Sequence, residues 1–183
     1  MTSALICGYG DLGRDIARQL HLKGITSYGI RRTPLSQPHA TIIPKDIFSL
    51  SVSDLPAADY VFFTIRPENR SERAYKKCYI HALKHLITLL KEHYHVPRKI
   101  ILCSSTEIYG NCFGKTVTEE TSINPQTTYA SILAESESLI KESPFNYLIL
   151  RLPTLYTDFP YLKKLRTNHL SYSQRVHYTN FIH

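Results

Sequence analysis

Three glycines near the start of the chain have the spacing of a phosphate-binding loop. They are Gly8, Gly10 and Gly13, in the stretch LICGYGDLGRDIARQL. The stretch runs from a short apolar segment into an amphipathic one, which is the context of a strand-to-helix turn. In such a turn the first glycine permits the bend, the second lets the backbone approach a pyrophosphate, and the third lets the helix pack against the strand. The amides that begin the helix, at Asp11 and Leu12, would then face the phosphates.

Two arginines follow the next apolar run and bear on which dinucleotide would bind. They are Arg31 and Arg32, in the sequence GIRRT. A site for NAD usually has Asp or Glu at this place, where the carboxylate holds the ribose hydroxyls. A 2′-phosphate is bound instead by guanidinium groups, through paired charge-assisted hydrogen bonds. The sequence therefore predicts NADP(H) in preference to NAD(H), the alternative being two surface arginines on a loop.

Strand-length apolar runs alternate with helix-like segments along most of the chain. The pattern predicts strands over 3–7, 27–30, 41–43, 60–65, 99–105 and 146–152, and helices over 11–24, 71–94 and 127–143. This alternation predicts an α/β fold of the Rossmann type, a doubly wound parallel sheet with helices on both faces. Ligands of such sheets bind beyond the carboxyl ends of the strands. Further cofactor contacts are therefore expected at Asp46, Ile47, Thr64, Ile65, Arg66 and Ser104.

Two motifs in the second half of the chain give a family resemblance. The stretch CSSTEIYG covers residues 103–110, and YASILAESE covers residues 129–137. Together with the glycine loop they resemble the extended short-chain dehydrogenase/reductase family, the NAD(P)-dependent epimerase/dehydratase group that often acts on nucleotide sugars. The resemblance extends from Ala4 to about Tyr156 and is closest to the atypical branch of that family.

The resemblance implies roles for several residues. Ser105 stands where the family has its catalytic Ser or Thr, and Tyr129 matches the tyrosine of the family's Y-x-x-x-K motif, a proton donor or acceptor during hydride transfer. Asp46 and Ile47 stand where the family holds the adenine. The lysine of the motif is replaced by Leu133. A tyrosine titrates near 10 and stays protonated at neutral pH without a nearby cation. Either the chemistry is weak, another group assists, or the site only binds.

The end of the chain predicts a shortened substrate-binding region. RLPTLY, residues 151–156, and HYTNFIH, residues 177–183, resemble stretches of the family after which a small substrate domain continues. We therefore expect a NAD(P)-binding Rossmann domain over 1–156 and a remnant of the C-terminal substrate-binding region over 157–183. Apolar surface left exposed by such truncation favours a homo-oligomer.

Composition limits the cellular location and the classes of partner that we expect for the chain. The chain has 183 residues, 43% of them hydrophobic, and a formal net charge of +7. No apolar run approaches the ~18 residues of a membrane span, and the start of the chain, which has no basic segment before the glycines, is not expected to be a signal peptide. The four cysteines lie far apart, which predicts a reducing, cytoplasmic location. Basic residues are scattered, so nucleic acid is an improbable partner. His81 and His85 lack the carboxylate of a zinc motif, so no metal site is predicted.

Three functions remain as hypotheses. The first is an NAD(P)-dependent epimerase/dehydratase-like oxidoreductase, acting on a nucleotide sugar or a similar hydroxyl or carbonyl compound. Its dinucleotide would exchange hydride with a small-molecule substrate that Ser105 and Tyr129 orient. The second is a catalytically silent NADP(H)-binding or sensor module, favoured by Leu133. The third is a nucleic-acid-associated protein with the same fold, which a strong salt-dependent affinity for DNA or RNA would indicate.

Overall fold

A single parallel sheet organises the chain. The computed structural model describes residues 1–155 and 181–182. Six strands lie in the order β3-β2-β1-β4-β5-β6, and every neighbouring pair is parallel. This is the order of the dinucleotide-binding doubly wound fold, in which the strand order reverses between β1 and β4. The bounds are β1 Ser3–Cys7, β2 Thr26–Arg31, β3 Thr41–Pro44, β4 Tyr60–Phe63, β5 Lys99–Ser105 and β6 Tyr147–Leu152.

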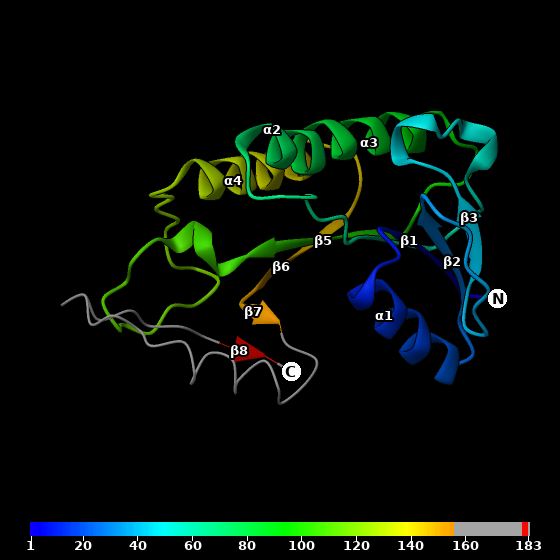
Figure 1. The fold of residues 1–183 in the computed structure, drawn as a ribbon, viewed down its shortest axis with the longest axis horizontal. Coiled ribbons are helices and arrows are strands. Elements are labelled where there is room, and N and C mark those ends of the chain that lie inside the picture. Colours follow the sequence, from blue (N-terminus) through cyan, green and yellow to red (C-terminus); the bar gives the residue numbers. More distant parts are fainter. Residues whose placement is uncertain (156–180, 183) are drawn as a thin grey trace.

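Helices cover both faces of the sheet, as the sequence predicted. Helix α1, Asp11–Leu22, lies on one face, while α2, Glu72–Tyr75, α3, Ala82–Glu92, and α4, Thr128–Lys141, lie on the other (Figure 1). Short 3-10 turns precede β4 and follow β5. They are η1, Ile47–Ser49, η2, Val52–Asp54, and η4, Thr106–Tyr109.

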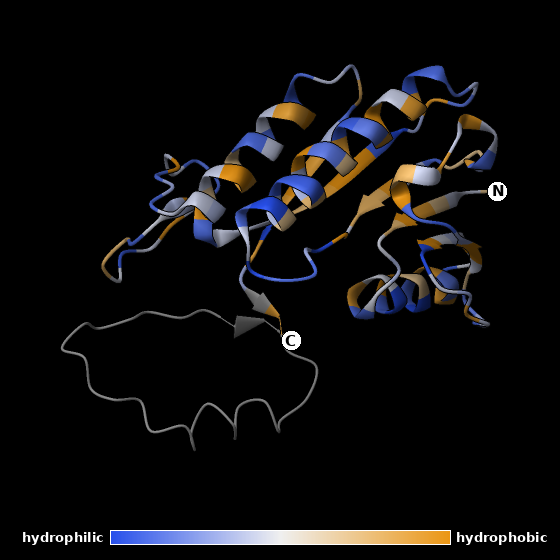
Figure 2. Ribbon diagram, turned by 45° about the horizontal axis from the view of Figure 1, so that its top comes forward, coloured by the Kyte–Doolittle hydropathy of each residue, from blue (hydrophilic) through white to orange (hydrophobic). Residues whose placement is uncertain are grey.

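The core forms where these layers meet. Figure 2 shows strands that are largely hydrophobic between helices that are partly hydrophilic. The main cluster joins α3 to the sheet through side chains such as Leu83, Leu86 and Phe63, all fully buried. A second cluster on the opposite face includes Ile6 of β1 and Ala17 of α1. Because parallel strands are buried on both faces, their sequences read as continuous apolar runs.

Two elements differ from the predicted ones. The strand expected over 60–65 ends at Phe63, because the following residues turn into the loop beside the glycines. The single helix expected over 71–94 is α-helical at both ends, with a π-helical segment, η3, at Lys76–His81 between them. The wider π turn changes which side chains share a face, and helical periodicity in the sequence does not reveal it.

A buried ion pair joins the last described helix to the last strand of the sheet. Arg151 of β6 donates to both carboxylate oxygens of Glu137 on α4, with Nε–Oε1 at 3.2 Å and Nη2–Oε2 at 2.9 Å. Glu137 is almost completely buried. Arg151 Nη1 also donates to the Tyr109 hydroxyl at 2.7 Å, and that hydroxyl donates to the Thr118 carbonyl. Strand, helix and the loop after β5 are therefore connected through one guanidinium.

The end of the chain is described only in part. A second, two-stranded sheet pairs β7, Thr154–Leu155, with β8, Phe181–Ile182. The rest of the predicted 157–183 region lies outside the described residues, so the two-domain division stays a prediction. Leu148 of β6 is half exposed, and self-association through apolar surface also remains a prediction. No helix within residues 1–155 is long and apolar enough to cross a membrane.

Candidate functional site

The glycine loop is the tightest part of the site. Gly8 has φ +100°, a conformation that side-chain-bearing residues rarely adopt, and a Cβ there would lie 2.5 Å from the Ile65 amide nitrogen. A Cβ on Gly13 would lie 2.8 Å from the Gly8 carbonyl oxygen. The Thr64 hydroxyl donates to the same oxygen at 2.9 Å, which connects the loop to the end of β4. Gly8 and Gly13 thus bring strand, turn and helix together.

Gly10 serves a different purpose, because no atom lies within 4 Å of where its Cβ would stand. It is the N-cap residue of α1, and no side chain caps that helix. The helix start therefore presents its amides, with the positive end of the helix dipole, to open space. A diphosphate fits this opening, which a side chain at residue 10 would enter.

One cavity connects this loop to the ends of the other strands. Its volume is about 680 Å³. It brings together most of the residues that the sequence singled out, namely Gly8, Gly10, Asp11, Leu12, Arg31, Arg32, Asp46, Ile47, Thr64, Ile65, Arg66, Ser104 and Ser105. Gly13 and Tyr129 do not line it. Its size and its place at the reversal of strand order suit a dinucleotide.

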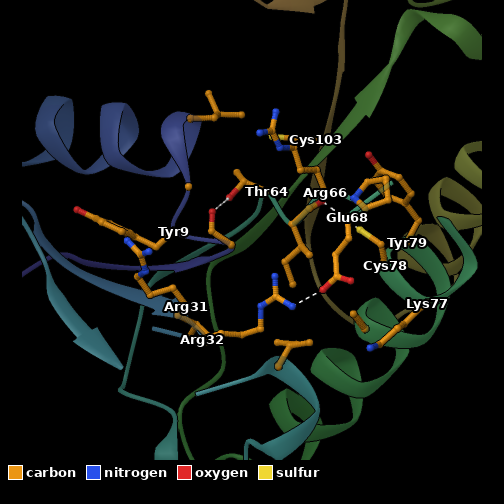
Figure 3. A pocket seen from close by; sticks show the side chains of 18 of the residues that line it. Tyr9, Arg31, Arg32, Thr64, Arg66, Glu68, Lys77, Cys78, Tyr79 and Cys103 are labelled. Atoms are coloured by element: carbon orange, nitrogen blue, oxygen red, sulfur yellow. Dashed lines mark hydrogen bonds and ion pairs between the residues drawn. The ribbon is translucent and has the colours of Figure 1, made fainter. Parts of the chain in front are cut away.

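The two arginines after β2 already have partners inside the protein. Arg32 Nη1 forms an ion pair with Glu68 Oε1 (Figure 3). Arg31 Nη2 donates to the Thr33 hydroxyl at 2.7 Å. Asp46, just after β3, accepts a hydrogen bond from the Phe48 amide at 2.9 Å and so caps η1. The adenosine end of the cavity is therefore bordered by groups that the protein itself holds in place.

Two serines at the end of β5 reach the middle of the cavity. Ser104 is buried, and its Oγ has no hydrogen-bond partner among the described residues. A buried polar atom without a partner is costly unless a ligand or water bonds it. Ser105 Oγ accepts from the Glu107 amide at 3.2 Å and caps η4. The Ser104 hydroxyl is therefore free to bond a ligand, whereas the Ser105 oxygen already accepts one backbone hydrogen bond.

The structure places Tyr129 beside the cavity rather than in its wall. Its hydroxyl donates to the Arg70 carbonyl at 2.9 Å, and its ring stacks on Tyr75 with centroids 4.5 Å apart. The Arg70 guanidinium lies 5.1 Å from the centre of the same ring. The hydroxyl is thus engaged with backbone, and the catalytic role of Tyr129 stays a prediction, as does that of Ser105.

Leu133, one turn further along α4, is buried in an apolar cluster with Ile108 and Tyr109. Tyr79 packs against this cluster and also lines the cavity. An aromatic ring therefore lies where the cavity approaches Leu133. No ammonium group reaches Tyr129 from position 133, as the sequence indicated.

The cavity wall also contains residues that sequence reasoning missed. Lys77, Cys78 and Tyr79 are consecutive in the π-helical segment, and all three line the cavity. Burial raises the pKa of the Cys78 thiol to about 12 and that of Cys103, on β5, to about 11. Burial also raises the pKa of Tyr79 above its usual range. These groups stay protonated at neutral pH, and no motif in the sequence marked them as part of the cavity wall.

The chain is similar to known proteins in sequence pattern and in fold. The model of the NAD dependent epimerase/dehydratase family matches residues 4–177. No curated protein sequence matches the chain. Among solved structures, MoeE5 in complex with UDP-glucose and NAD is 22% identical, with a TM-score of 0.71 over 84% of this chain and 55% of its own.

Two other structures have the same fold. UDP-glucuronic acid 4-epimerase from Bacillus cereus, in complex with NAD, is 22% identical, with a TM-score of 0.70 over 85% of this chain and 57% of its own. UDP-N-acetylglucosamine 4-epimerase from Methanobrevibacter ruminantium M1, in complex with UDP-N-acetylmuramic acid, is 21% identical, with a TM-score of 0.68 over 85% and 56%. The chain thus spans little more than half the length of these proteins.

The predicted preference for NADP(H) over NAD(H) is wrong. Several solved structures that share this fold were obtained in complex with NAD, MoeE5 and the Bacillus cereus epimerase among them. The physical reason lies in the partners of the arginines, since the Arg32 guanidinium is ion-paired with Glu68 and Arg31 is bonded to Thr33. Two adjacent arginines in a sequence do not show whether their charge is available to a phosphate.

Proposed function

The chain belongs to the NAD dependent epimerase/dehydratase family, and on this premise we propose that its cavity binds NAD. The open face of Gly10 carries this proposal, because it leaves the start of α1 uncovered toward the cavity. The backbone around Gly10, Asp11 and Leu12 would hold the diphosphate, and the ends of β2, β3 and β4 would hold the adenosine. When bound, NAD supplies the capacity to accept or return hydride.

The substrate side of the proposal is an oxidoreductase reaction on a nucleotide sugar or a similar alcohol or carbonyl compound. UDP-sugars are bound in solved structures that share this fold, UDP-glucose in MoeE5 and UDP-N-acetylmuramic acid in the Methanobrevibacter ruminantium M1 epimerase. Ser104 and Ser105 supply hydroxyl groups at the end of β5, and the buried Ser104 Oγ is uncommitted within the described residues. Ser105 would orient the reacting oxygen of the substrate. The Tyr129 hydroxyl, once it has left the Arg70 carbonyl, would give a proton to that substrate oxygen or take one from it.

Binding of NAD without turnover is the second candidate function. The Tyr129 hydroxyl is bonded to backbone, and Leu133 is buried among apolar side chains where the family's motif has a lysine. The hydroxyl already donates its hydrogen bond to the Arg70 carbonyl, and position 133 offers no ammonium group to activate it as a base. A screen of nucleotide sugars with NAD separates the two functions, since a silent module binds the dinucleotide but shows no turnover.

All four cysteines are free thiols, which supports a reducing compartment such as the cytoplasm.

Replacing Gly10 by Ala tests the proposal. The new methyl group meets no protein atom within 4 Å, so folding should change by less than about 1 kcal/mol. It enters the space of the diphosphate, so NADH affinity measured by calorimetry should fall about tenfold or more. An unchanged melting temperature with weakened NADH binding supports the proposal. Equal NADH affinity in wild type and variant, or no affinity in wild type, contradicts it.

A further inference from the structure

The geometry points to Glu68 as the residue that makes the cavity select NAD over NADP, by pairing with Arg32. This inference rests on the proposed binding of NAD and assigns its specificity to a residue outside the glycine loop and outside β2. The pair is formed between Arg32 Nη1 and Glu68 Oε1 (Figure 3). The two residues are 36 positions apart in the chain.

The ion pair bridges the cofactor side of the sheet. Arg32 comes directly after β2, Thr26–Arg31, and Glu68 comes in the loop after β4, Tyr60–Phe63. Strand β1 lies between those two strands. The contact therefore passes over the end of β1, where the glycine loop begins. Arg32 and Glu68 line the same cavity as Gly10.

Charge explains the expected selectivity. The adenosine ribose of a dinucleotide is held near the end of β2 in this fold. A 2′-phosphate there needs a guanidinium donor, but the Arg32 guanidinium is held by the Glu68 carboxylate. To reach Arg32, the 2′-phosphate of NADP would have to break that ion pair. The phosphate would then lie close to the Glu68 carboxylate, and the two negative charges would repel each other. NAD carries no such phosphate, and ribose hydroxyls can donate to a carboxylate. Glu68 thus provides the acidic group that the end of β2 lacks.

The other cations nearby do not replace Arg32. Arg31 Nη2 donates to Thr33, Lys45 Nζ lies 2.7 Å from Asp54 Oδ1, and Lys77 Nζ lies over the Phe48 ring, 5.5 Å from its centre. Arg66 lines the cavity and follows β4 rather than β2. Freeing Arg32 is therefore the direct route to a 2′-phosphate contact.

The ion pair is exposed to solvent, so it can be removed with little effect on folding. The Arg32 and Glu68 side chains are 64% and 62% exposed. Exposed ion pairs contribute little to folding, so Glu68→Gln should leave the fold intact while removing the charge. Glu72→Gln is the matched control, because Glu72 pairs with Lys76 at 2.7 Å on the exposed side of the same segment and does not line the cavity.

The experiment measures dissociation constants for NADH and NADPH in wild type, Glu68→Gln, Glu72→Gln and Glu68→Gln/Arg32→Met at fixed salt. We expect wild type to prefer NADH. In Glu68→Gln the preference should shift toward NADPH by about tenfold or more, while Glu72→Gln should match wild type. Adding Arg32→Met should abolish the shift, because the phosphate loses its donor.

The outcomes distinguish failure of the proposed role of Glu68 from failure of the proposed NAD binding. An unchanged NADH to NADPH ratio in Glu68→Gln, with both dinucleotides bound, overturns the role of Glu68 and leaves the proposed function standing. A shift that survives Arg32→Met also overturns it, because the phosphate then uses another cation. If wild type binds neither dinucleotide, the proposed function fails, and the inference fails with it.

Discussion

The buried pair of Arg151 and Glu137 gives the clearest test of how the second half of the sheet is held together. Replacing Arg151 by Met removes the guanidinium that bonds both carboxylate oxygens of Glu137. The carboxylate is left almost fully buried, with only the Lys141 ammonium 3.9 Å away. Removing one partner of such a pair costs about 3–5 kcal/mol, because desolvation of the remaining charge is no longer offset.

The expected consequence is a large drop in stability. For a chain of this size each kcal/mol corresponds to about 2–4 °C, so the melting temperature should fall by roughly 6–20 °C. Urea unfolding followed by circular dichroism measures the free energy of unfolding directly. The control is Arg151→Met/Glu137→Leu, which replaces both charges by apolar side chains.

The double variant should recover most of the lost stability, since apolar groups of similar volume often substitute for a buried ion pair without cost. The Tyr109 hydroxyl keeps its bond to the Thr118 carbonyl in either variant. A single variant within about 1 kcal/mol of wild type would refute the reasoning, and so would a double variant as unstable as the single one.

Two further predictions concern the glycine loop and the thiols. Gly8→Ala should cost about 2–5 kcal/mol, from the unfavourable positive φ and the clash with the Ile65 amide; wild-type stability in urea would contradict this. Burial raises the pKa of Cys7 and Cys78 to about 12 and of Cys103 to about 11. Well below the ordinary thiol pKa of 9.0 these thiols are protonated in both states, and as pH rises through that value they ionise first in the unfolded chain. The free energy of unfolding should therefore fall as pH rises from 9 to 11, and a flat profile would exclude this linkage.

Much of the fold was predictable because its signals are local. The spacing of Gly8, Gly10 and Gly13 carries the turn within six residues, and the buried parallel strands are visible as continuous apolar runs. The end of β4 was misplaced by two residues, because Thr64 has an apolar neighbour but turns to bond the loop. The π segment at Lys76–His81, which packs against α4, was missed, because residue spacing does not distinguish one π-helical turn from the α-helix around it.

The candidate site was likewise predictable only in part. The residues of the glycine loop and the strand ends could be named from the sequence, since parallel strands bring their carboxyl ends to one edge. The pairing of Arg32 with Glu68 could not be named, because the two residues are distant in the chain. Similarly, a tyrosine in a motif gave no sign that its hydroxyl would bond the Arg70 carbonyl.

The sequence by itself determined the parallel sheet, the helix start left open at Gly10, and the absence of a lysine at position 133, because residue type and short spacing are enough for these. The tertiary structure decided which charges are available and which side chains reach the cavity. Those properties depend on contacts between segments far apart in the chain, such as Arg32 with Glu68 and Arg151 with Glu137, and no local pattern encodes them.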